Sequence, residues 1–185
     1  VDSSETDTLP AESYVSGQWR KLAKPDTTNA FFSPDFTFGR MNGAVAYDSL
    51  RGYVYVFGGE WSTYEDALMF MLNDLHRWDG FYWERKGMGG ALPPARRGHS
   101  MVYDIQRDKL VVFGGEQYIV PQSDKRNDVW EWNGEGWSMK SITGTKPSER
   151  VFHCMAYDRK RAVSVVFGGD IGTAGVSLTD QTWEF

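Results

Sequence analysis

Apolar residues gather in short runs along the chain, and three of these runs end in a pair of glycines. They occupy residues 54–59, 110–115 and 163–169 and read VYVFGG, LVVFGG and VSVVFGG. Continuous apolar runs rich in β-branched and aromatic residues are typical of strands buried on both faces. The glycine pairs are expected to end these strands where a positive φ or close packing is needed. The pattern therefore predicts an all-β protein.

Each run closes a longer segment that occurs three times. The copies are GAVAYDSLRGYVYVFGGE (43–60), HSMVYDIQRDKLVVFGGE (99–116) and HCMAYDRKRAVSVVFGGD (153–170). From the Asp of the Tyr-Asp pair to the first glycine is 10 residues in every copy. A spacing kept this tightly indicates a structural repeat. Each copy is predicted to form strand, tight turn and strand, with the Asp bonding turn amides.

A second pair of strands follows in the first two repeats. The segments NDLHRWDGFYWERK (73–86) and NDVWEWNGEGWSMK (127–140) both predict two strands joined by an Asp-Gly or Asn-Gly hairpin. The third copy ends in TDQTWEF (179–185) and holds only the first of these two strands. A full repeat is therefore predicted to be a four-stranded antiparallel sheet.

These features resemble the Kelch family: paired glycines after an apolar strand, a Tyr at a fixed distance upstream, and a Trp on the fourth strand. The resemblance covers about residues 13–185 and implies a β-propeller in which each repeat is one blade. The blades are expected at about 40–86, 96–142 and 150–185, after a flexible acidic tail at 1–12. Three blades are fewer than the roughly four to eight that propellers usually have.

The beginning of the chain offers a partner for the third blade. Residues 14–22, YVSGQWRKL, align with WNGEGWSMK (132–140) so that Trp19 matches Trp137. Segment 14–22 is therefore predicted to be the fourth strand of the third blade, whose open edge would otherwise invite aggregation. We favour exchange of this strand between two copies, which closes a six-bladed homodimeric ring. The alternatives are another protein that supplies further blades, and a compact three-bladed monomer.

Charge and hydropathy narrow the range of partners. The net charge is −5, and the four acidic residues of 1–12 leave −1 for the remainder. A nearly neutral body lacks the basic footprint of a nucleic-acid-binding protein. No apolar run approaches the roughly 18 residues of a membrane span, so no membrane insertion is expected. The missing initiator Met slightly favours a processed secreted or organellar protein over a cytoplasmic one.

One face of the predicted propeller carries short turns and the other carries long loops, among them 60–72 and 116–126. Long loops on a rigid scaffold are common binding sites, and aromatic side chains on them are good anchors. The candidate contacts are Phe31, Phe32, Phe36, Trp61, Tyr64 and Tyr118. They predict a non-catalytic protein-interaction module, or alternatively a secreted or lumenal carbohydrate-binding propeller. The competing interpretation is that these aromatics pack on their own loops or on a subunit seam.

A second set of candidates recurs once per blade near the expected channel mouth. These residues are Arg40, Arg96 and Arg150, each eight residues before the repeat Asp, together with His99 and His153. A ring of arginines could hold an anionic ligand through charge-assisted hydrogen bonds. We favour instead a structural role, in which the arginines pair with acids such as Asp74 and Asp128 or bond loop carbonyls.

Metal and cofactor chemistry receives little support, and we predict no catalytic residue, metal or cofactor. Asp74 and His76 form a weak metal pattern, because Trp130 and Trp183 occupy the position of His76 in the other copies. Some Kelch-like propellers are copper oxidases with a Cys–Tyr cross-link and His ligands. Here His153 and Cys154 are adjacent, and adjacent strand residues point to opposite faces. The apolar segment 67–72 is expected to extend strands, cap a seam or form a partner surface.

Overall fold

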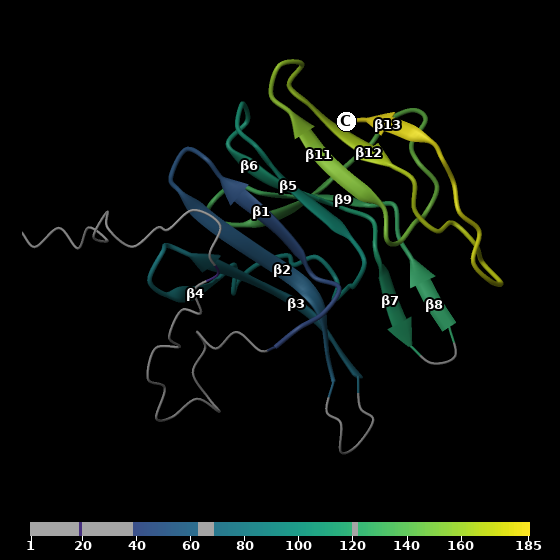
Figure 1. Ribbon diagram of the computed structural model, residues 1–185, viewed down its shortest axis with the longest axis horizontal. Helices are drawn as coiled ribbons and strands as arrows, with labels where there is room; N and C mark the ends of the chain where they lie inside the picture. Colours follow the sequence, from purple (N-terminus) through teal and green to yellow (C-terminus); the bar gives the residue numbers. More distant parts are fainter. Residues whose placement is uncertain (1–18, 20–38, 63–68, 120–121) are drawn as a thin grey trace, which may run out of the picture.

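The computed structural model describes residues 19, 39–62, 69–119 and 122–185, and its regular elements there are all β-strands (Figure 1). The strands are β1 (Ala44–Asp48), β2 (Tyr53–Ser62), β3 (Met69–Trp78), β4 (Trp83–Lys86), β5 (Ser100–Asp104), β6 (Lys109–Phe113), β7 (Glu116–Ile119), β8 (Gln122–Lys125), β9 (Val129–Trp132), β10 (Trp137–Lys140), β11 (Cys154–Asp158), β12 (Val163–Phe167) and β13 (Thr182–Glu184). The all-β prediction is thereby confirmed. These described residues form no helix that is long and apolar enough to cross a membrane.

The strands form one sheet per repeat, and we call these sheets blades 1, 2 and 3. Blade 1 has the order β1-β2-β3-β4, blade 2 the order β5-β6-β9-β10, and blade 3 the order β11-β12-β13. Neighbouring strands are antiparallel throughout. The first strands of successive blades, β1, β5 and β11, contact one another in turn (Figure 1). Strands β7 and β8 form a separate hairpin inserted in blade 2.

The turn between the first two strands is shaped by the repeat Asp, as the sequence predicted. In blade 1, Asp48 Oδ1 accepts hydrogen bonds from the backbone amides of Leu50 (2.9 Å) and Arg51 (3.1 Å). Asp104 and Asp158 accept the equivalent amide hydrogen bonds in blades 2 and 3. A side chain that satisfies two turn amides stabilises a tight connection, so this end of every blade carries a short turn.

The glycine pair allows β2 to pass closely beside the segment that leads into β1. Gly58 and Gly59 have φ of 59° and 92°, a region that favours glycine. A Cβ at Gly59 would lie 2.6 Å from the carbonyl oxygen of Met41. Pairing between β2 and β3 shifts register between Phe57 and Gly59 and then continues. The glycines therefore permit a bulge and a close backbone approach at the same point.

A buried arginine links the strands within each blade. In blade 1, Arg40 donates to the Gly58 carbonyl (3.0 Å) and to both carboxylate oxygens of Asp74 (2.8 and 2.9 Å). Asp74 also hydrogen-bonds the Nε2 of His76 at 2.7 Å. Burial alone would raise the pKa of Asp74, but the hydrogen bonds to His76 and Arg40 lower it well below its usual range.

Blades 2 and 3 repeat this arrangement with one change of charge. Arg96 donates to the Gly114 carbonyl (2.9 Å) and to both oxygens of Asp128 (2.8 Å each). Arg150 donates to the Gly168 carbonyl (2.9 Å) and to the neutral Gln181 (3.2 Å). The ring nitrogens of Trp130 and Trp183 donate to Asp128 and Gln181 respectively. Position 76 and its equivalents therefore serve packing and hydrogen bonding inside the blade.

The blades pack face to face, and the two end blades each leave one face open. Strand β5 is buried on both faces because it lies between β1 and β11. In β1 the side chains alternate: Ala44 and Ala46 are buried against blade 2, whereas Val45 and Tyr47 are 60% and 58% exposed. The outer face of blade 3 exposes Phe167 and its neighbours in β11. Among the described residues, these two outer faces do not close on each other.

Candidate functional site

Two hairpins project from the side of the molecule opposite the short turns (Figure 1). The sequence predicted long loops at 60–72 and 116–126, but much of each is strand. Strand β2 continues to Ser62 and pairs with β3 from Met69 onward. Strand β7 pairs with β8, beginning with Glu116 opposite Lys125. The surface is therefore built on two β-hairpins, which position side chains more rigidly than irregular loops do.

Arg97 connects the two hairpins. Its guanidinium donates to Glu60 on β2 (2.9 Å) and to Glu116 on β7 (2.8 Å), and both carboxylates are buried. It also lies over the ring of Tyr118, 4.8 Å from the centroid. Burial would lower the pKa of Arg97, but the hydrogen bonds to Glu116 and Glu60 raise it overall. The guanidinium is therefore a permanent cation that fixes the hairpins relative to each other.

Apolar side chains flank this ion cluster. The rings of Trp61 and Phe70 stack with centroids 5.2 Å apart. Met69 and Phe70 are 47% and 45% exposed, and the Met69 sulfur lies 3.9 Å from Arg97 Nη1. We call Trp61, Met69, Phe70, Arg97 and Tyr118 the loop-face patch. Exposed Met and aromatic groups around a fixed cation provide adaptable apolar contact and one oriented charge.

The structure describes only some of the aromatic residues that the sequence singled out. Trp61 and Tyr118 lie on the two hairpins that Arg97 connects. Four further candidates, Phe31, Phe32, Phe36 and Tyr64, lie outside the described residues, as do Ala67 and Leu68.

Sequence reasoning missed Arg97, and it considered Phe70 only as one member of the apolar segment 67–72. A signal for Arg97 was available, since blade 2 has Arg-Arg at 96–97 where the other blades have Arg-Met at 40–41 and Arg-Val at 150–151. No comparable signal marked Phe70, because it lay within an apolar run that was read as one unit.

The residues expected at the channel mouth are built into the scaffold. Arg96 and Arg150 are fully buried, and Arg40 is nearly so. His99 and His153 are buried too, with their rings edge-on to Phe57 (5.3 Å) and Phe113 (5.1 Å). The arginines donate to carbonyls and to side chains of their own blades, so the five residues present no open ring of charge. The arginines hold the strands of one blade together, and the two histidine rings pack against the preceding blade.

The buried histidines predict that the protein loses stability in mild acid. Burial, with the positive charge of Arg96, lowers the pKa of His99 to about 3, and burial with Arg150 lowers that of His153 to about 4. The unfolded chain, with histidine pKa about 6.5, takes up protons first as the pH falls. Each histidine should then cost about 1.4 kcal/mol of stability per pH unit between about pH 6.5 and its folded pKa.

This dependence can be measured by urea unfolding at pH values from 7 to 4.5. In His99→Gln the slope of unfolding free energy against pH should be smaller by about 1.4 kcal/mol per unit. Carboxylates with lowered pKa values contribute mainly below this window, so they do not obscure the comparison. An unchanged slope in the variant would show that His99 is not the group responsible.

The described residues contain no group of three or more His, Cys, Asp or Glu side chains placed to hold a metal ion. Although His153 and Cys154 are adjacent, His153 is buried and Cys154 is exposed.

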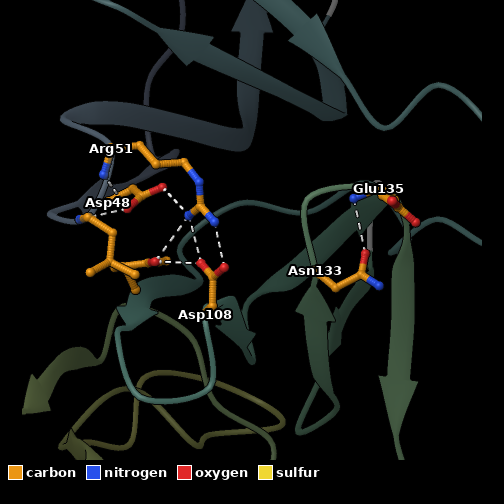
Figure 2. Close-up of polar contacts among 7 residues, drawn as sticks. Asp48, Arg51, Asp108, Asn133 and Glu135 are labelled. Carbon is orange, nitrogen blue, oxygen red and sulfur yellow. Dashed lines mark hydrogen bonds and ion pairs between the residues drawn. The ribbon is translucent and has the colours of Figure 1, made fainter.

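A polar cluster joins blades 1 and 2 at the short-turn end (Figure 2). Arg51 donates to Asp48 in its own turn (3.0 Å) and to both oxygens of Asp108 in the neighbouring blade (2.7 and 2.5 Å). Hydrogen bonds from Arg51 and Tyr103 lower the pKa of Asp108 to about 2. Figure 2 also shows the nearby turn in which the Glu135 amide donates to Asn133. The Arg51 guanidinium thus pairs with a carboxylate of each blade, and these ion pairs stabilise the contact between blades 1 and 2.

The chain matches a known protein family over most of its described length. The model of the KLHDC2/KLHL20/DRC7 Kelch-repeats domain matches residues 41–185. Human multiple epidermal growth factor-like domains protein 8 (Homo sapiens) is 29% identical over 165 residues, which cover 85% of this chain and 5% of that protein. Kelch domain-containing protein 2 of Mus musculus is 27% identical over 177 residues, covering 83% and 40%. Rab9 effector protein with kelch motifs of Danio rerio is 29% identical over 136 residues, covering 69% and 36%.

The chain thus spans less than half the length of these relatives. The solved structure of YjhT superposes with a TM-score of 0.59 at 16% identity, covering 82% of this chain and 43% of that one. At this identity the likeness concerns the fold alone. The family model covers most of the chain, and the repeat motifs and blade architecture agree with it. The chain therefore belongs to the Kelch-repeat family and has the Kelch-type propeller fold.

Proposed function

We propose that this chain is a protein-interaction module that binds a protein partner through the loop-face patch. The observation that carries the proposal is the Arg97 cluster, which holds two projecting hairpins together and leaves Met69 and Phe70 exposed beside it. Exposed apolar groups next to a fixed charge are the composition of interface centres. Kelch relatives support the proposal, because one of them is a Rab9 effector by name.

The test compares partner capture by the wild-type chain and by a Phe70→Ser, Tyr118→Ala double variant. Crosslinking with quantitative mass spectrometry should show partners whose recovery falls about tenfold or more in the variant, as expected for interface anchors. Tyr82→Ala is the matched control, because Tyr82 is an exposed aromatic in the β3–β4 turn at the opposite end. Equal recovery with both variants would contradict the proposal. Glycan-array binding that the double variant loses would favour the carbohydrate-binding alternative instead.

We further propose that two copies assemble through the open faces of their end blades. In the seam between blades 1 and 2, Phe57 of blade 1 packs against the face of blade 2 that carries Met101 and Tyr103. Phe167 on the outer face of blade 3 is the repeat equivalent of Phe57, and Val45 and Tyr47 on blade 1 are those of Met101 and Tyr103. The two exposed faces are thus the two halves of one seam. Joined in both directions, they make a closed ring of six blades.

Phe167→Glu is expected to weaken this self-association by about tenfold or more, because it places an unpaired charge in an apolar contact. Phe167 is exposed in the single chain, so the variant should keep its stability within about 0.5 kcal/mol. Light scattering over a concentration series measures the association. Val176→Glu, at an exposed site beyond β12, is the control. A wild-type chain that stays monomeric at all concentrations would refute the assembly.

A further inference from the structure

A cavity of about 150 Å³ lies in the seam between blades 1 and 2, at the short-turn end. Its apolar walls are Tyr55 of blade 1 and Leu110 and Trp132 of blade 2, all three of which are buried. Figure 2 shows two further parts of the wall, the Arg51 cluster and the turn at Asn133. A cavity of this volume accommodates a molecule of about the size of benzene. No residue of the loop-face patch lines it, so it is a separate site.

Arg77 of β3 brings a cation with an unused hydrogen-bond donor to this cavity. Its Nη2 donates to Glu84 (2.7 Å), but Glu84 also accepts a hydrogen bond from Lys86, and its side chain is 46% exposed. The guanidinium lies over the ring of Tyr53, 4.2 Å from the centroid. Its Nε is buried and has no hydrogen-bond partner among the described residues. A buried donor of this kind is normally satisfied by water or by a ligand.

The unused donor results from one difference between the blades. Blade 2 has Glu131 at the position of Arg77, and Arg107 of the preceding turn donates to it (2.6 Å). Blade 1 has Arg51 at the position of Arg107, so two cations stand where blade 2 has an ion pair. Arg51 instead donates to Asp108 of the neighbouring blade (2.7 and 2.5 Å). Arg77 therefore makes no ion pair with the turn of its own blade.

The carboxylates of the cavity wall are already paired, and they limit the charge of a ligand. Asp48 accepts hydrogen bonds from two turn amides and from Arg51. Asp108 accepts hydrogen bonds from Arg51 and from the Tyr103 hydroxyl (2.5 Å). Two carboxylates beside one cavity repel further negative charge. A ligand with a single negative charge is therefore favoured over a dianion such as phosphate.

We propose that this cavity binds a small planar organic acid whose single carboxylate accepts a hydrogen bond from Arg77 Nε. Arginine binds carboxylates through charge-assisted hydrogen bonds. The flat body of the ligand would lie against Trp132 and Tyr55, and apolar walls with a few fixed polar groups are the usual composition of small-molecule sites. Burial raises the pKa of Tyr55, so its hydroxyl stays protonated and is a second donor beside Arg77.

An NMR titration of the ¹⁵N-labelled full chain with benzoate tests the site. We expect saturable shifts of the Trp132 indole and of the Asn133 and Gly134 amides, with a dissociation constant in about the millimolar range. Benzamide has the same shape without the charge and should bind about tenfold or more weakly. The absence of saturable shifts with benzoate would mean that water alone fills the cavity, which would overturn the proposal. Inorganic phosphate that shifts the same resonances would overturn the choice of a singly charged carboxylate.

Variants of Arg77 identify the anchor. Arg77→Gln should raise the dissociation constant for benzoate about tenfold or more, and Arg77→Lys, which keeps the charge, should have a smaller effect. Arg85→Gln is the matched control, because it removes the same charge from an exposed site on the adjacent strand β4 and should leave binding nearly unchanged. Equal effects of Arg77→Gln and Arg85→Gln would show that only the overall charge matters and would overturn the assigned contact. The test uses no residue of the loop-face patch, so its outcome is independent of the proposed protein-interaction function.

Discussion

Arg96→Met is expected to lower the free energy of unfolding by about 3–5 kcal/mol, the usual cost of removing one partner from a buried ion pair. The guanidinium is fully buried and bonds Asp128, the Gly114 carbonyl and the Pro94 carbonyl. Methionine fills similar space but leaves the Asp128 carboxylate without its cation. Urea unfolding at pH 7 and fixed protein concentration measures the change.

Substitutions of two further arginines serve as comparisons for the stability loss expected of Arg96→Met. Arg150→Met should cost less than Arg96→Met, because the partner of Arg150 is the neutral Gln181 and no buried carboxylate is left unpaired. Arg161→Met removes an exposed ion pair with Asp158 and Glu184 and should leave the unfolding midpoint nearly unchanged. Equal losses for Arg96 and Arg161 would contradict the assigned role of the buried pair.

Trp137→Ala is expected to cost about 3–5 kcal/mol, as large-to-small changes of buried aromatic residues usually do. The ring is buried between Phe57 and Trp132, and its loss would leave a cavity in the seam between blades 1 and 2. Thermal and urea unfolding of the full chain measure the loss. Trp83→Ala is the matched control, because Trp83 holds the equivalent position on the open face of blade 1 and is only partly buried. If Trp83→Ala lowered the unfolding free energy of the monomer as much as Trp137→Ala does, the outer face of blade 1 would have to be covered, which would contradict its assignment as an open face.

The sequence predicted the repeated features of the fold well, because they depend on contacts within one blade. The repeat Asp bonds its own turn, and the glycine pair ends its own strand region. These interactions join residues of one repeat, so alignment of three copies reveals them. The family resemblance and the all-β prediction are confirmed by the family match and the structure.

Contacts between blades were harder to predict from the sequence. Arg97 joins Glu60 of blade 1 to Glu116 of blade 2, and such a pairing is visible only once the order and facing of the blades are known. The ion pair that Arg51 forms between blades 1 and 2 was also not evident from the sequence. Its counterpart Arg107 pairs with Glu131 on the third strand, but blade 1 has Arg77 at that position, and Arg51 pairs with Asp108 of blade 2 instead. The hairpins within 60–72 and 116–126 were read mainly as loops, because the polar residues there, and Pro121 in the second segment, are also typical of loops.

The contrast between β5, buried on both faces, and the half-open β1 and β11 makes the blades a short linear array. In such an array each unit is stabilised by its neighbours, so the end units open more readily than the middle one. Ring closure would turn both ends into interior units. The cooperativity of unfolding would then increase with protein concentration, and amide protection at the ends of the array would report directly on the population of closed rings.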